Sequence, residues 1–298
     1  MFWFKKKPKV EEDKNPRLAA VLDRHLSKYI RVVNINNSVK TAMILFGLTF
    51  FMFNILIGSM DVKKTDHIAS IGFTGTISSE NPMANARSFS EVFFKAIEDT
   101  SAKAIVIIAN SGGGSPTQAE AINQMVSEYT ALPLAERKPV YVTVQEVCAS
   151  ACVLAFASAD KIMAHHNSLV GSISVRMDGW AIDKALKNLD IERKVITTGK
   201  YKALFDPYRN LDESEADFIR TEVMGPMHKH FVDTVIAGRG DKLDLSNEML
   251  FTGMIWTGQD GVSVGLVDQI QSTYYVEEEL KEMFSVSEVK RYNRPPRF

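Results

Sequence analysis

The stretch KPVYVTVQEVCASACVLAFASADKIMA, residues 138–164, decides the fold. It begins with an apolar, β-branched run, Val140–Val144, which is typical of a buried strand. CASAC follows, and the small apolar residues after it predict a helix. Between such a strand and helix, the hydroxyl of Ser150 would lie at the strand end beside unpaired backbone N–H groups. Ser150 is therefore a candidate nucleophile; the alternative is a small residue in a tight helix–sheet contact.

The two cysteines of the chain, Cys148 and Cys152, flank Ser150. If both lay on one face of a helix, their β-carbons would be roughly 5–6 Å apart, which is too far for an unstrained disulfide. We therefore expect two small, buried thiols, and the cysteine count does not fix the cellular compartment.

Length and composition bound the architecture. The chain has 298 residues, 45% hydrophobic and 24% charged, with a net charge of −1. This suits one α/β domain plus an attachment, or two small domains. The near-neutral charge and the lack of a nucleic-acid-binding motif give no reason to expect nucleic acid as a partner.

The N-terminal region predicts membrane attachment. Residues 1–39 carry nine lysines and arginines against four acidic residues, and apolar residues recur there at helical spacing. We expect a basic cytoplasmic segment with an amphipathic helix on an anionic surface, an ordinary surface helix being the alternative. Within residues 40–60, the stretch Thr41–Met60 is uncharged and long enough to span a bilayer. The positive residues before it predict a single-pass anchor with residues 61–298 outside the cytoplasm; a cleaved signal peptide is the alternative.

Residues 61–275 alternate between strand and helix patterns, which predicts a layered α/β domain. The buried-strand pattern at residues 104–109 runs into NSGGG, residues 110–114. That turn lacks the closing residues of a phosphate-binding loop and the third glycine of a dinucleotide fingerprint. Two interpretations of this turn are therefore left, an oxyanion hole and a simple tight turn. Residues 276–298 are expected to form an acidic helix and a basic tail.

Taken together, the motifs resemble the serine peptidases typified by signal peptide peptidase A and SohB. The similarity covers residues 68–270 and rests on the order of several motifs. They are AIVIIANSGGGS, KPVYVTVQEVCASAC with ADKIMA, VGSISV, TTGKYKALFDP, AGRG and WTGQDGVSVGLVD.

The resemblance implies a crotonase/Clp-protease-like layered domain with an N-terminal transmembrane helix, and a Ser-Lys dyad without cofactor or metal. Ser150 would be the nucleophile, Lys202 the general base and Ser172 the group that orients the lysine. The oxyanion donors implied are the N–H groups of Gly113 or Gly114 and of Ala151 or Ser150; of these we favour Gly113, Gly114 and Ala151.

The resemblance also implies substrates and assembly. Signal-peptide remnants and other hydrophobic, membrane-derived peptides are the expected substrates. A ring- or dome-shaped homo-oligomer is the expected assembly, with active sites near protomer boundaries, so Ser150 and Lys202 could meet across a boundary. The expected location is the cell inner membrane, with the peptidase domain on the outer, periplasmic side.

The sequence departs from the family pattern next to the nucleophile. Gly112 replaces a proline of the glycine turn, and Ala151 and Cys152 replace two glycines. A catalytically inactive membrane scaffold of the same fold therefore stays open.

Two other kinds of enzyme also stay open. A Clp-like Ser-His-Asp peptidase would use His165 or His166 as base, and a crotonase-like acyl-transfer enzyme would share the oxyanion turn. His228 and His230 do not predict a zinc site, because no third ligand is signalled.

Overall fold

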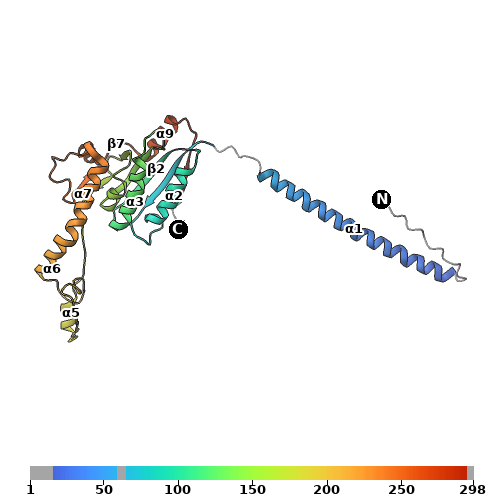
Figure 1. Ribbon diagram of the computed structural model, residues 1–298, viewed down its shortest axis with the longest axis horizontal. Helices are drawn as coiled ribbons and strands as arrows, with labels where there is room; N and C mark the ends of the chain where they lie inside the picture. The colour runs from blue at the N-terminus through green and yellow to red at the C-terminus, as the bar shows by residue number, and fades with distance from the viewer. Residues whose placement is uncertain (1–15, 59–64, 294–298) are drawn as a thin grey trace. The chain divides into compact units, whose positions relative to one another are not determined.

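The computed structural model describes residues 16–58 and 65–293, and it divides the chain into two units, Met1–Lys64 and Thr65–Phe298 (Figure 1). The first unit is built on one helix, α1 (Pro16–Gly58). Its sequence has no proline after Pro16 and no glycine before Gly47, so nothing breaks the helix between the basic and the apolar part. The predicted amphipathic helix and the predicted anchor are thus stretches of one helix.

The anchor prediction for residues 40–60 is only partly covered by the described helix. Residues 59 and 60 lie outside the described residues, as do residues 1–15 of the basic segment. Within the part of the chain that the structure describes, no helix meets the length and apolar character needed to cross a membrane. The transmembrane anchor therefore stays a prediction.

The second unit is built on an eight-stranded, mainly parallel sheet. In chain order the strands are β1 (His67–Thr74), β2 (Ala102–Ser111), β3 (Val140–Ala149), β4 (Lys161–Ala164), β5 (Leu169–Gly171), β6 (Ile255–Thr257), β7 (Gln269–Ile270) and β8 (Glu288–Arg291). The helices are α2 (Ala86–Glu98), α3 (Pro116–Thr130), α4 (Ala151–Phe156), α5 (Asp183–Asn188), α6 (Glu213–Phe218), α7 (Gly225–Arg239), α8 (Gly258–Ser263) and α9 (Thr273–Met283). A π-helical turn, η1 (Ile219–Met224), joins α6 to α7, and a 3₁₀ turn, η2 (Gly240–Lys242), follows α7.

The strand order is β6-β5-β3-β2-β1-β8, and β4 and β7 branch off β3. Strand β3 changes neighbour along its length: its first half pairs with β4 and its last residues pair with β5. A bulge in β2 between Ala109 and Ser111 brings Ser111 opposite Cys148 on β3. The carboxyl ends of β2, β3 and β5 therefore meet at one edge of the sheet, where parallel α/β sheets commonly bind ligands.

Two helical layers cover the sheet, because successive side chains on a strand point to opposite faces. On one face α2, α3 and α4 enclose the larger core, in which the ring of Phe73 lies edge-on to Phe156 at 4.9 Å between centroids. On the other face Val276 and Leu280 of α9 pack on Ile68 and Val106. Burying each of these side chains contributes about 1.5–3 kcal/mol. The layered α/β domain predicted from the sequence is confirmed.

The C-terminal stretch belongs to this same unit. Helix α9 begins at Thr273 and not at residue 276, and β8 adds a parallel edge strand beside β1. The tail beyond the helix was not expected to form a strand, since EVKR carries more charge than a typical strand. Residues 294–298 of the predicted basic tail lie outside the described residues.

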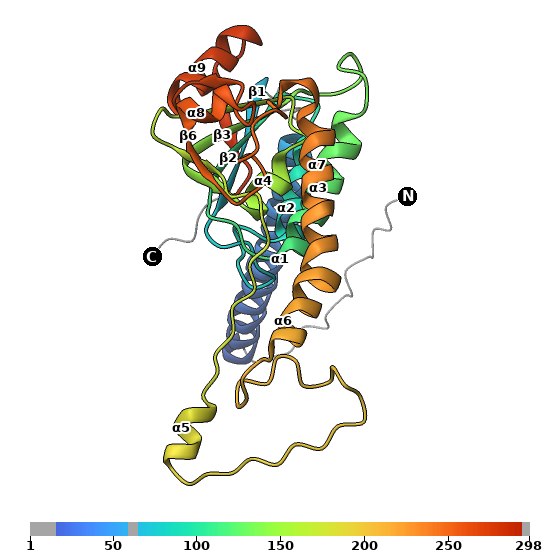
Figure 2. The ribbon, with the colours of Figure 1, turned by 90° about the vertical axis from the view of Figure 1, so that its left-hand side faces the viewer.

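Between β5 and α6 the chain leaves the sheet as an extended segment, residues 176–212, which we call the arm. Figure 2 shows it projecting beyond the helical layers, with α5 near its far end and α6 leading back into α7. Most apolar side chains of the arm are solvent-exposed; these are Met177, Trp180, Ile182, Leu189, Ile191, Val195, Ile196, Tyr201, Phe205, Tyr208 and Leu211.

Candidate active site

Ser150 occupies a tight turn between strand β3 and helix α4. Its backbone has φ 53° and ψ −124°, a conformation that residues with a side chain rarely adopt. The Ser150 N–H donates to the carbonyl of Gly171 (2.8 Å), and its carbonyl accepts from the N–H of Val153 (2.9 Å). The hydroxyl does not cap α4. An unusual backbone held by its surroundings is typical of functional sites, so the geometry favours a nucleophile over a mere packing contact.

The glycine turn lies directly against Ser150. Gly113 and Gly114 have φ of +103° and +146°, which favours glycine at both positions. A Cβ on Gly113 would lie 2.8 Å from the Cβ of Ser150 and 3.0 Å from the nitrogen of Ala151. A Cβ on Gly114 would lie 2.2 Å from the carbonyl oxygen of Ile77. The backbone can therefore approach Ser150 and Ile77 this closely only because residues 113 and 114 have no side chains.

The N–H groups around this contact have different partners. The N–H of Gly113 donates to the Oγ of Ser111 (3.2 Å), and the N–H of Ser150 is bonded to Gly171. Among the residues that the structure describes, the N–H groups of Gly114 and Ala151 have no acceptor. Of the three predicted oxyanion donors, Gly114 and Ala151 thus have N–H groups without an acceptor among the described residues, whereas Gly113 donates within the turn; their role as oxyanion donors stays a prediction.

Ser172 lies beside the turn at Ser150. The pairing of β3 with β5 sets Ala149 opposite Gly171, so the residues that follow each of them, Ser150 and Ser172, leave the sheet side by side. Ser172 also has a positive φ, 54°, and its N–H donates to the carbonyl of Met254 (2.7 Å). The structure therefore brings two of the three predicted dyad-associated residues together.

Lys202 is the residue that the structure does not bring to the site within one chain. It lies in the arm, in the segment between α5 and α6, and its side chain is exposed. Within the described ranges its ammonium group has no hydrogen-bond or ion-pair partner; only its backbone N–H is bonded, to Gly199 (3.1 Å). The neighbouring Lys200 extends over the ring of Tyr201, 4.9 Å from its centroid.

The histidines of the alternative mechanisms contact other groups. His165 accepts the N–H of Thr273 through Nε2 (3.3 Å), and His166 contacts its neighbour Asn167. His230 forms an ion pair with Glu120 (3.3 Å) when protonated. Across residues 16–58 and 65–293, no group of three or more His, Cys, Asp or Glu side chains is arranged to hold a metal ion.

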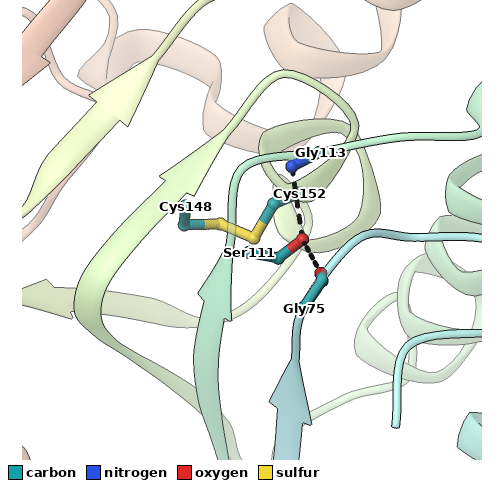
Figure 3. Close-up of a disulfide and its surroundings, with 5 residues drawn as sticks. All are labelled: Gly75, Ser111, Gly113, Cys148 and Cys152. Atoms are coloured by element: carbon teal, nitrogen blue, oxygen red, sulfur yellow. Dashed lines mark hydrogen bonds between the residues drawn. A yellow bond between two sulfur atoms is a disulfide. The ribbon is translucent and has the colours of Figure 1, made fainter. Parts of the chain in front are cut away.

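The two cysteines correct the sequence analysis. Cys148 and Cys152 form a disulfide, with their Cα atoms 5.2 Å apart (Figure 3). The expectation of two free thiols was wrong because it placed both on one helix. In the structure Cys148 is the last but one residue of strand β3, Cys152 lies in the first turn of α4, and the turn at Ser150 brings them together. The four-residue spacing around a candidate nucleophile was the only signal in the sequence.

Comparison with known proteins identifies a family for this chain. The profile of a family described as "Peptidase family S49" matches residues 133–287. The matched region contains Ser150, Ser172 and Lys202, whereas the glycine turn at Gly113 and Gly114 precedes it.

Three curated relatives show how far the similarity extends. A Na(+)/H(+) antiporter NhaA of Brucella abortus is 34% identical over 63% of this chain and 25% of its own length. A candidate protease of Methanocaldococcus jannaschii is 30% identical over 68% of this chain and 63% of its own. A candidate signal peptide peptidase SppA of Enterococcus faecium is 29% identical over 68% and 57%. The chain thus spans a quarter to under two thirds of the length of these relatives.

Proposed function

The chain belongs to peptidase family S49, and from this premise we propose that it is a serine endopeptidase with a Ser-Lys dyad formed by Ser150 and Lys202. The observation that carries the proposal is the backbone of Ser150. It is held at a positive φ against a glycine turn, with unpaired N–H groups nearby.

The proposed chemistry is acyl transfer to the serine. The Ser150 hydroxyl attacks the peptide carbonyl while the neutral amine of Lys202 accepts its proton. The N–H groups of Gly114 and Ala151 stabilise the negative oxygen of the tetrahedral intermediate; each such donor contributes about 3 kcal/mol. The ammonium group then protonates the leaving amine, and water hydrolyses the acyl-enzyme by the reverse sequence of proton transfers.

A shared active site would reconcile this chemistry with the exposed lysine. A lysine accepts a proton only as the neutral amine, which burial favours. Since the arm of one chain leaves Lys202 in solvent, we propose that a second copy of the chain receives the arm and that Lys202 of one copy serves Ser150 of the next. The hydroxyl of Ser172, next to Ser150, would form a hydrogen bond with the amine of the incoming Lys202 and so orient it.

The proposed location is the inner membrane, with the peptidase domain on the periplasmic side. Helix α1 supports the anchor through a run of exposed apolar side chains from Met43 to Phe53, and the excess of positive charge before it supports a cytoplasmic N-terminus. The Cys148–Cys152 disulfide supports an oxidising compartment for the peptidase domain.

The proposed substrates are hydrophobic peptides released within or near the membrane, such as signal-peptide remnants. This part of the proposal rests on the family and on the relative named as a signal peptide peptidase. A peptidase domain tethered beside the bilayer would meet such peptides at high local concentration.

The direct test compares four full-length proteins in detergent: wild type, Ser150→Ala, Lys202→Ala and the matched control Lys200→Ala. Hydrolysis of a quenched-fluorescent apolar peptide should fall by about 10⁴-fold or more in the first two variants and stay near the wild-type rate in the control. A fluorophosphonate probe should label wild type and fail to label Ser150→Ala. An inactive, unlabelled wild type would favour the membrane scaffold.

Mixing the two inactive variants tests whether the site is shared. If Lys202 acts on a neighbouring copy, a one-to-one mixture that exchanges subunits should regain about a quarter of the wild-type rate, because one boundary in four then pairs an intact serine with an intact lysine. A mixture that exchanges subunits yet stays inactive would mean that the dyad forms within one chain.

A further inference from the structure

We propose that the Cys148–Cys152 disulfide is a positioning element for Ser150, so that peptidase activity depends on this bond. The inference rests on the proposed function. We call residues 148–152 the nucleophile turn. The bond joins Cys148, one residue before the end of β3, to Cys152, the second residue of α4, and Ser150 lies midway between them in the sequence.

The backbone at Ser150 requires external support. A residue with a side chain at φ 53° and ψ −124° persists only when its surroundings over-determine it. On one side that support is the hydrogen bond from its N–H to Gly171. On the other side the disulfide closes the chain from Cys148 to Cys152. Their exposed fractions are 5% and 0%, so both ends of the bond are fixed in the core.

The loop that the disulfide closes is short, with a sequence separation of four. Constraint of the unfolded chain by a disulfide grows with loop length, so a bond this local does little to hold distant parts of the fold together. Its main consequence is to limit the conformations of the three residues it encloses, and Ser150 is the middle one. The short spacing therefore fits a role in positioning Ser150 better than a role in stabilising the whole fold.

The disulfide also lies beside Ser111, the residue that holds the glycine turn in place. Cys148 pairs with Ser111 across β2 and β3. The Oγ of Ser111 donates to the carbonyl of Gly75 (2.6 Å) and accepts the N–H of Gly113 (3.2 Å). Figure 3 shows the disulfide and Ser111 at the ends of the paired strands, with the hydrogen bonds of Ser111 to Gly75 and Gly113. The nucleophile turn and the glycine turn are thus fixed from neighbouring points.

Reduction would release one of these two turns. It adds two electrons and two protons to the S–S bond and gives two thiols; a dithiol supplies both and becomes a disulfide itself. The chain from residue 148 to residue 152 could then relax Ser150 toward an ordinary backbone conformation, whereas Ser111 would still hold Gly113. Because both sulfurs are buried, reductant reaches them slowly, and substitutions are the cleaner probe.

The test is a double-mutant cycle on the full chain: wild type, Cys148→Ala, Cys152→Ala and the double variant. The bond itself is checked by mass, since reduction adds two hydrogens to wild type. We expect each single variant to lose about 10- to 100-fold in kcat and in the rate of fluorophosphonate labelling, with KM unchanged. The double variant should be no worse than either single one, because the first substitution already removes the bond.

The outcomes separate packing from positioning. If the cysteines matter only as packed side chains, the losses of the single variants add in the double variant and follow the loss of thermal stability; either result would overturn the inference. Wild-type labelling rates in all three variants would overturn it too, with the proposed function intact. A wild type that neither labels nor hydrolyses would reject the proposed function and, with it, this inference.

Discussion

The nucleophile turn and the arm differ in almost every physical respect, although they are proposed to supply the two halves of one reaction. Around Ser150, residues 148, 149, 151 and 152 are each at most 5% exposed, and a disulfide and backbone hydrogen bonds fix their geometry. In the arm, Trp180 and Ile196 are 85% and 97% exposed. One chain therefore fixes the surroundings of Ser150, the proposed nucleophile, and leaves Lys202, the proposed general base, on an exposed segment.

On the proposed function, this difference would make activity depend on assembly. Exposed apolar surface is unfavourable by roughly 25 cal/mol per Å² relative to its buried state, so an arm of this composition gains most from a covering partner. Activity would then require association, because Ser150 of one copy would need Lys202 of another copy as its general base.

The largest effect is expected from a substitution in the glycine turn, which packs against Ser150. Gly113→Ala adds a Cβ that would lie 2.8 Å from the Cβ of Ser150. We expect kcat to fall by about 10²–10³-fold, because the turn must shift away from the position that presents the Gly114 N–H.

The matched control for this substitution is Gly112→Ala, one residue earlier. A Cβ there has no neighbour within 4 Å, so hydrolysis should stay near the wild-type rate. Steady-state kinetics of both variants provide the measurement. Equal activities would mean that the approach of the glycine turn to Ser150 has no part in catalysis.

The second prediction concerns the ion pairs at the C-terminal end of helix α7. Helix α7 leads from the arm to the sheet and ends at Arg239, whose buried guanidinium pairs with Asp268 at 3.0 Å. Lys242 pairs with the same carboxylate at 2.7 Å. Asp268→Asn leaves Arg239 without its charge partner and should lower the free energy of unfolding by about 3 kcal/mol. The exposed neighbour Asp241 supplies the control, Asp241→Asn.

The same pair predicts a pH dependence. Burial by itself would raise the pKa of the Asp268 carboxyl, but its interactions with Arg239 and Lys242 outweigh burial and lower that pKa. A carboxyl with a lowered folded-state pKa stabilises the fold above its unfolded-state pKa of about 3.9, and this contribution fades as the pH falls toward the folded-state value. Denaturant unfolding at pH 7 and below pH 4 should therefore show a smaller effect of Asp268→Asn in acid. An effect of the same size at both pH values would contradict the assignment.

Sequence reasoning succeeded where the physics is local. Val140–Val144 and residues 104–109 are buried strands because continuous β-branched runs suit parallel strands covered on both faces. The turn at Ser150 was predicted for the same reason, since a change from strand pattern to helix pattern needs a turn.

What the sequence could not reveal depends on three-dimensional pairing. The disulfide needs the positive φ of Ser150, which no composition signals. The role of Ser111 as acceptor for Gly113 needs the bulge that sets it opposite Cys148. Only the family resemblance raised the option that Lys202 lies far from Ser150 within one chain. A sequence motif indicates which residues act together, but not whether they belong to the same copy of the chain.

The smallest expected effect tests the arm as a surface for a second copy. Replacing Trp180 or Ile196 by serine removes exposed apolar area that, on this proposal, is buried only in the assembly. The fold of the single chain should be unaffected, since neither side chain packs in a core. Self-association should weaken by about tenfold for each substitution, equivalent to about 1.4 kcal/mol, and hydrolysis at low protein concentration should fall in parallel.

The control is an aromatic residue with similar exposure on the sheet-bound part of the unit. Tyr275 on α9 is 72% exposed, and Tyr275→Ser should leave self-association unchanged. Sedimentation velocity in detergent measures all three variants against wild type. If Trp180→Ser and Ile196→Ser associate as tightly as Tyr275→Ser, the arm is not the contact between copies. The exposed lysine would then have to reach Ser150 by folding back within its own chain, which would make the contrast between the two regions a property of the resting state alone.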